Sequence, residues 1–192
     1  MERLTKKKTK RRASSQPAAG LLSFDEVPDA YLFAGKSRVS DVDSALKRVL
    51  DVEKKTGATI HIVDADVVCG PAHLASALLH ARRSHANHRA RARDIKVELM
   101  MYLSGQRQID RAIQIAGLSP RTRALGFVIE APREAAEKTA TLLAQTFDLT
   151  PDLSVLTPGL PKLARLGVLP GSPKDTDLEA LALEAVAILD LE

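Results

Sequence analysis

Apolar residues follow two different periods along the chain, and together they predict an α/β protein. Three short runs rich in aliphatic and β-branched residues predict strands at 30–34, 59–63 and 124–129. Elsewhere apolar residues recur at i, i+3, i+4 and i+7, which is typical of helices packed by one face. We therefore expect a single α/β domain, in which about six to eight helices pack on a small mixed, largely antiparallel sheet.

Capping residues and prolines set the expected helix boundaries. Asp41 can cap one helix, which should end near Gly57, and Pro71 suits the start of another. The segment 157–175 is rich in proline and glycine, so it predicts a broken connector. The other expected elements are helices at 89–103, 134–147 and 176–191, a short helix at Lys162–Leu166 and a short strand at Leu153–Leu156.

Two helical patterns meet at Ser104 and Gly105. Ser104 could cap the first turn of the second helix, and Gly105 has no side chain to block access to the backbone. With Gln106 and Arg107 in that first turn, such a helix start can bind a phosphate. An ordinary amphipathic helix with a solvated polar face explains the same pattern. Its apolar stripe would be Ile109, Ala112, Ile113 and Ala116.

A dense basic cluster lies at residues 82–93. Such a cluster could neutralise several phosphates, or it could be a solvated loop between two helices. In the preceding helix His73 and Arg83 share a polar arc, while Arg82 lies on the far flank of the apolar stripe. The cluster contains Arg82, Arg83, Arg89, Arg91 and Arg93, with His85 and His88 between them.

The predicted helix 89–103 is apolar on more than one side, which indicates burial between other elements. Glu98 lies within it and therefore needs a partner, for which a nearby arginine is the natural candidate. Arg107 could be that arginine, in which case it would fix the helix corner rather than contact a ligand.

The last helix has two apolar sides. One wide stripe can dock on the domain, and a second patch on the other side would be exposed unless a partner covers it. The alternative is a terminal helix buried on both sides. The chain after Lys174 has six acidic residues and no basic residue, so a partner should be basic at its rim. The second patch consists of Ala180, Leu183, Ala187 and Leu191.

Charge is distributed unevenly. The chain of 192 residues has a formal net charge of +4, yet residues 1–12 alone carry seven Lys or Arg and one Glu. The high isoelectric point thus belongs largely to this segment. We expect 1–22 to be a disordered basic tail and 23–192 to be the domain. The tail could add affinity for nucleic acid or could be a solvated extension.

Several function classes find no support. The single cysteine, Cys69, excludes an internal disulfide and suits the cytoplasm. No apolar run approaches the length of a membrane span, and no secretory signal follows the basic start. The spacing of His73, His80, His85 and His88 does not fit a metal site. We find no catalytic constellation or phosphate loop, and expect neither a cofactor nor a small-molecule substrate. Metal analysis of the pure protein would expose a metal-dependent enzyme.

Three stretches resemble one family. VDADVV at 63–68 is followed by His73, SGQRQIDRAI spans 104–113 after VELMMYL, and the chain ends in EAVAILDLE. These features are similar to the tRNA-recruiting small subunit of the KEOPS complex, the archaeal relative of the PRPK-binding protein family. The resemblance covers about residues 58–130 and, more loosely, the C-terminal helix.

The resemblance implies a compact α/β subunit without enzymatic activity, in the complex that makes threonylcarbamoyladenosine in tRNA. It implies binding to the kinase/ATPase subunit, for which we expect the patch Ala180, Leu183, Ala187 and Leu191. It also implies binding to the single-stranded 3′ CCA end of tRNA. For this RNA we expect Ser104, Gly105, Gln106 and Arg107, with His73, Arg82 and Arg83 nearby. The alternative is a stand-alone RNA-binding module that uses the basic tail and the 82–93 cluster.

Overall fold

An antiparallel sheet forms the centre of the protein. The computed structural model describes residues 20–24, 27–168 and 177–190. Four strands are ordered β1-β2-β4-β3, and the short strand β5 also pairs with β2. Strands β2 and β4 pair along their whole length, from Ala30 opposite Glu130 to Lys36 opposite Ala124. The strands are β1 Leu21–Ser23, β2 Ala30–Lys36, β3 Thr59–Asp64, β4 Ala124–Glu130 and β5 Thr150–Pro151.

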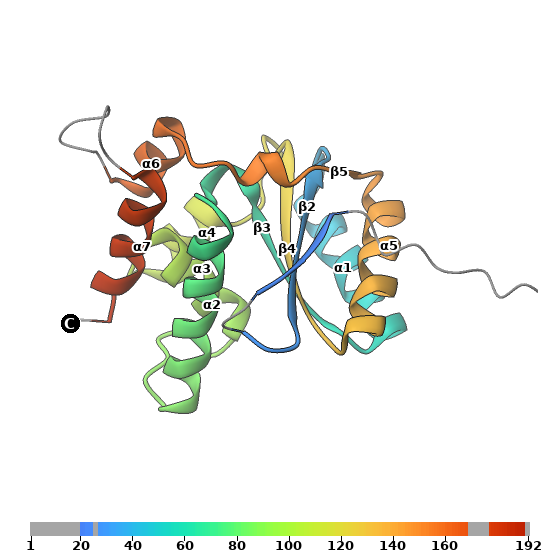
Figure 1. Cartoon of the computed structure of the whole chain (residues 1–192), viewed down its shortest axis with the longest axis horizontal. Coiled ribbons are helices and arrows are strands. Elements are labelled where there is room, and N and C mark those ends of the chain that lie inside the picture. Colours follow the sequence, from blue (N-terminus) through green and yellow to red (C-terminus); the bar gives the residue numbers. More distant parts are fainter. Residues whose placement is uncertain (1–19, 25–26, 169–176, 191–192) are drawn as a thin grey trace, which may run out of the picture.

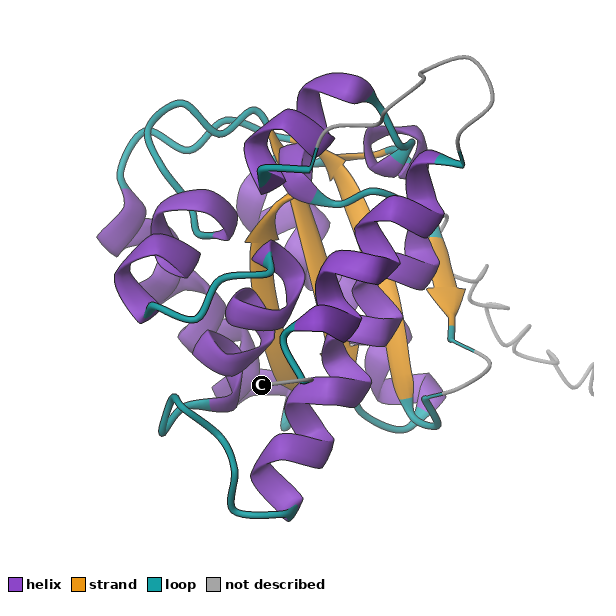
Figure 2. Ribbon diagram, turned by 90° about the vertical axis from the view of Figure 1, so that its left-hand side faces the viewer, coloured by secondary structure: helices purple, strands orange, loops and turns teal. Residues whose placement is uncertain are grey.

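Helices cover both faces of the sheet (Figure 1). Helices α1 and α5 lie on one face, and the other described helices gather on the opposite face, as Figure 2 shows from the side. No described helix is both long and apolar enough to cross a membrane. The helices are α1 Val42–Thr56, α2 Pro71–Ala86, α3 Ile95–Ser104, α4 Ile109–Ala116, α5 Arg133–Phe147, α6 Leu160–Leu166 and α7 Leu178–Ile188; short 3-10 helices, η1 and η2, cover Ala65–Val67 and Leu153–Leu156.

This architecture confirms the α/β fold with a largely antiparallel sheet. Capping residues act as the sequence predicts: the Asp41 side chain accepts the N–H of Asp43 at 3.1 Å, and Gly57 ends α1 with φ +72°. Helix α3 is buried on several sides, as its pattern indicates. It packs against α2, α4 and α7 and also contacts β3.

Some boundaries differ from those expected. Residues 153–156 form the 3-10 helix η2 rather than a strand, because the Asp152 side chain caps this turn by accepting the N–H of Ser154 at 3.0 Å. Strand β1 includes Leu21 and Leu22 of the expected tail, and Gly20 forms a turn before it; residues 1–19 lie outside the described residues. Helix α3 begins at Ile95 instead of 89, after its cap Asp94.

Helix α4 is buried through its small residues. Ala112 and Ala116 are fully buried, whereas Ile109 and Ile113 of the same expected stripe are 39% and 43% exposed. Alanines allow α4 to approach α3 closely, and the two isoleucines then lie at the margin of this contact. The buried stripe of α4 is therefore narrower than the sequence pattern predicts.

Candidate protein and RNA interfaces

Helix α7 lies on the outside of α2 and α3, away from the sheet (Figure 1). Its inner side consists of Ala182, Val186 and Leu189, which are buried. Gly105 ends α3 with φ +63°, a left-handed conformation that favours glycine, and it lies so close to α7 that a Cβ there would be in van der Waals contact with Ala185 at 3.4 Å. One face of α7 is thus docked on the domain, as the sequence predicts.

Polar contacts fix both ends of α7. At its start the Glu179 carboxylate accepts the N–H of Ala72, in the first turn of α2, at 3.0 Å. Beyond its end the Asp190 carboxylate accepts the Tyr102 hydroxyl at 2.6 Å, lies 2.6 Å from His80 Nδ1, and pairs with Arg83. Because α2 and α3 supply all these partners, α7 has one defined position on them.

The outer side of α7 is open and mainly apolar, with the exposed Glu184 between its alanines. Ala180 and Ala187 are exposed and Leu183 is half-buried, while Leu191 lies outside the described residues. Leu183 borders a groove of about 450 Å³ together with Leu79 of α2, whose side chain is 37% exposed. Ile188 is 56% exposed and extends this outer surface, although the apolar pattern of the helix places it on the wide stripe that docks on the domain.

The junction at residues 104–105 ends a helix instead of starting one. Ser104 is buried, and its hydroxyl donates back to the Met100 carbonyl at 2.7 Å. The Gly105 N–H donates to the Tyr102 carbonyl, and that of Gln106 donates to Met101 at 3.0 Å. These N–H groups cap the end of α3, and α4 begins only at Ile109. The expected phosphate seat on free N–H groups of this junction was therefore wrong.

Two residues after this junction remain accessible. The Arg107 side chain is exposed, and Gln106 is half-buried with its amide donating to the Ser104 carbonyl at 3.3 Å. Their turn directly follows Gly105, which packs on α7. A ligand at Arg107 would therefore lie beside the docked helix.

His73 lies inside the protein, so it does not belong to an open RNA surface. Its ring is 0% exposed, and Nδ1 accepts the N–H of Cys69 at 3.1 Å. Burial lowers the pKa of His73 from 6.5 to about 4. The imidazole is therefore neutral at pH 7, and its protonation would remove a buried hydrogen-bond acceptor.

Because the pKa of His73 is lowered by folding, the unfolded chain binds its proton more readily. The stabilisation is complete above pH 6.5 and is lost as the pH falls towards 4. We expect about 3 kcal/mol of unfolding free energy to be lost over this range. Urea unfolding at several pH values measures this slope, the fall of the unfolding free energy with falling pH. The slope should be smaller in His73→Gln, whose amide oxygen can still accept the N–H of Cys69. An unchanged slope in the variant would contradict the assignment.

Arg82 and Arg83 are sequence neighbours with different surroundings. Arg82 pairs with Glu130 at the end of β4, and the same carboxylate contacts His61 of β3. Burial raises the pKa of Glu130, but hydrogen bonds from His61 and Arg82 outweigh this and bring it to about 2. Arg82 thus joins α2 to the sheet. Arg83 is 58% exposed and lies beside the end of α7 through Asp190.

Glu98 is fully buried, as its apolar surroundings predict, but its partners differ from those expected. One oxygen accepts the Ser84 hydroxyl at 3.1 Å, and the other accepts the N–H groups of Arg91 and Ala92 at 3.0 and 2.8 Å. Among the described residues, the arginine side chain that we expected is not one of its donors. The carboxylate instead holds the backbone of the loop between α2 and α3.

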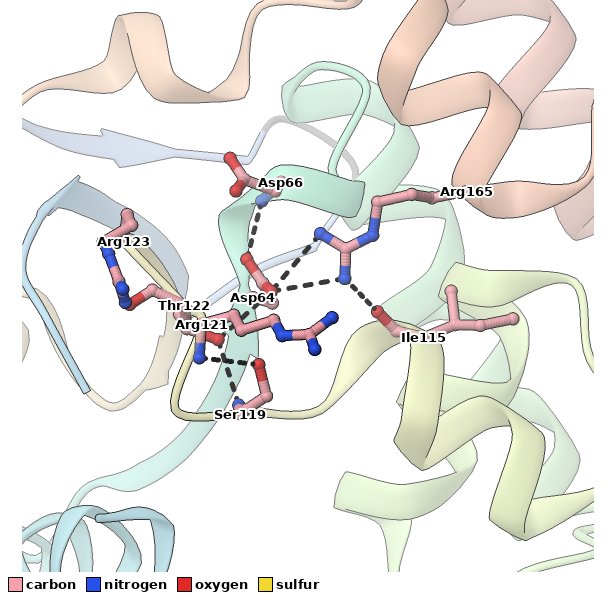
Figure 3. A network of polar contacts seen from close by, with 8 residues as sticks. All are labelled: Asp64, Asp66, Ile115, Ser119, Arg121, Thr122, Arg123 and Arg165. Atoms are coloured by element: carbon pink, nitrogen blue, oxygen red, sulfur yellow. Dashed lines mark hydrogen bonds and ion pairs between the residues drawn. The ribbon is translucent and has the colours of Figure 1, made fainter. Parts of the chain in front are cut away.

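The motif VDADVV contributes a second buried carboxylate (Figure 3). Asp64, at the end of β3, accepts the Thr122 hydroxyl at 3.1 Å and contacts the Arg165 guanidinium at 3.3 Å. Arg165 also donates to the Ile115 carbonyl at 3.0 Å. This network joins α6 to the sheet and to the end of α4. Sequence reasoning missed it, since 101 residues separate Asp64 from Arg165.

Comparison with known proteins identifies the central part of the chain. The family model described as kinase binding protein CGI-121 matches residues 37–153. This range includes VDADVV, the Glu98 loop and the α3–α4 junction, whereas α7 follows it in the chain. No curated protein matches the chain.

Proposed function

Because the chain belongs to the CGI-121 family of kinase-binding proteins, which is the family of the small KEOPS subunit, we propose that it is a non-catalytic KEOPS subunit. In this function it binds the kinase/ATPase subunit with α7. It also binds the 3′ CCA end of tRNA and so brings RNA to the complex that makes threonylcarbamoyladenosine. The observation that carries the proposal is a terminal helix docked by one face, with its other apolar face open, in a chain of this family.

The chemistry of the α7 surface supports the protein contact. An apolar groove lined by Leu79 and Leu183 can accept an apolar side chain of a partner. Exposed alanines at 180 and 187 allow a partner to approach the helix closely. Burial of an apolar surface costs less desolvation free energy than burial of a charged one, so this surface suits a lasting complex.

Arg107 supports the RNA contact. Its exposed guanidinium can bind a phosphate or stack on an unpaired base, and Gln106 adds an amide beside it. The turn that carries both residues adjoins α7 through Gly105 and Ala185. An RNA end bound there would thus lie next to the kinase-like partner, which fits recruitment of substrate to a complex.

The RNA part is tested by size-exclusion chromatography with tRNA that carries or lacks its CCA end. We expect more tRNA to co-elute when the end is intact, and Arg107→Glu should weaken binding of this tRNA about tenfold because it reverses the charge at the phosphate. Arg133→Glu, on α5 at the opposite face of the sheet, is the matched control. Equal binding of both tRNAs would refute recognition of the end.

Co-expression with the kinase-like subunit tests the other part. We expect the two proteins to elute together without RNA. A protein that binds tRNA but never elutes with this partner would instead be a stand-alone RNA-binding module.

A further inference from the structure

A basic cleft lies between the α2–α3 loop and the end of α7, apart from Arg107. It measures about 490 Å³, and its lining includes Arg83, Asn87, Arg89 and Arg91. We propose that this cleft binds the phosphates of a double-stranded RNA segment. The inference rests on the proposed function, to which it adds a second contact beside the one to the 3′ end.

The loop that carries these arginines is held from inside. Glu98 accepts the N–H groups of Arg91 and Ala92, and the Arg89 N–H donates to the Ser84 carbonyl at 2.8 Å. Because these bonds use backbone atoms, they do not engage the side chains of Arg89 and Arg91, and both residues are exposed. The loop is therefore fixed before a ligand arrives, which lowers the entropic cost of binding.

The cleft has an excess of positive charge. Three arginines line it, and Asp190 is the acidic residue among its lining groups. Asp190 already pairs with Arg83 and accepts from the Tyr102 hydroxyl. The guanidinium of Arg91 additionally contacts the Leu189 carbonyl at 3.4 Å. Among the described residues of the lining, Arg89 and Arg91 thus have no acidic partner, and guanidinium groups bind phosphate in bidentate geometry.

The lining favours paired over unpaired RNA. Unpaired bases are bound by stacking on exposed rings, but Tyr102, the aromatic residue among the described lining, is only 2% exposed and its hydroxyl donates to Asp190. A double helix shows its phosphates outside and its bases inside, so charged groups without a stacking ring suffice to bind it. The geometry therefore points to the backbone of a duplex.

A gel-shift titration with a blunt-ended RNA hairpin, which has no single-stranded 3′ end, tests this site in the full-length protein. Arg89→Glu should weaken binding at least about tenfold and lower the dependence on salt concentration. The side chain of Arg89 is exposed, so the fold should persist, and circular dichroism checks this. If the glutamate variant does not fold, Arg89→Gln replaces it, with an expected loss of about threefold.

Arg133→Glu makes the same charge change on α5 and should alter binding less than about twofold. The basic residues 1–12 are present in every variant, so their contribution cancels in the comparison. Equal affinities of Arg89→Glu and Arg133→Glu would overturn the proposal, as would absence of hairpin binding. Displacement of the hairpin by an equal concentration of a polyglutamate peptide would also overturn it, in favour of an acidic protein ligand.

A single-stranded oligonucleotide ending in CCA distinguishes this proposal from the proposed function. If the oligonucleotide still binds through Arg107 while the hairpin does not bind, the duplex site fails and tRNA-end recognition stands. If the oligonucleotide does not bind but the hairpin requires Arg89, the duplex site stands and recognition of the tRNA end fails.

Discussion

Replacing Leu183 by arginine should abolish co-purification with the kinase-like subunit, with an affinity loss of at least about 100-fold. The side chain borders the groove beside Leu79, so a guanidinium there would have to be buried without a partner when the two proteins meet. The isolated protein should remain folded, because the substitution lies on the open side of α7. Affinity capture of the tagged variant from co-expressing cells measures the effect.

Leu46→Arg is the matched control for this experiment. Leu46 is an exposed leucine of α1, on the opposite face of the sheet, with 41% of its surface accessible. We expect normal co-purification of this variant, because its position is remote from α7. Capture of the partner by Leu183→Arg at the level of Leu46→Arg would contradict the assignment of the kinase-binding face.

The second large effect concerns Glu98. In Glu98→Ala the Ser84 hydroxyl and the N–H groups of Arg91 and Ala92 lose their buried acceptor. Buried donors left without an acceptor should cost about 2–4 kcal/mol. The melting temperature should therefore fall by about 5–10 °C, as measured by differential scanning calorimetry.

Glu134→Ala makes the same chemical change at the surface, where Glu134 pairs with Lys138. This control should cost less than about 0.5 kcal/mol, because an exposed ion pair contributes little. Similar melting temperatures for the two variants would show that Glu98 does not hold the loop. The comparison removes the general effect of deleting one negative charge.

The elements that sequence predicted best are those set by local chemistry. Helix α1 begins at Asp41 and ends at Gly57 as expected, because caps depend on neighbouring residues alone. The Ser104–Gly105 pair shows the limit of this reasoning. A serine and a glycine between two periodic segments suit either a helix end or a helix start. In the structure they end α3, and α4 begins only four residues after Gly105, at Ile109.

Contacts between distant segments could not be predicted. The burial of Glu98 followed from its apolar neighbours. Two of its donors, however, are backbone N–H groups of a loop, and such donors cannot be recognised from residue types because nearly every residue has one. For α7 the two apolar sides were evident, yet the position of Ile188 depended on how the helix lies across α2 and α3. His73 had the pattern of a surface residue and is buried because α2 is covered on several sides.

The bonds that fasten α7 join residues far apart in the sequence. Glu179 meets Ala72 across 107 positions, and Asp190 meets His80 across 110. These contacts can form only after α7 has been synthesised, so a nascent chain exposes the apolar sides of α2 and α3 until α7 has left the ribosome. Such a chain would need shielding in that interval, and a partner that holds α7 in place would also slow degradation of the finished protein.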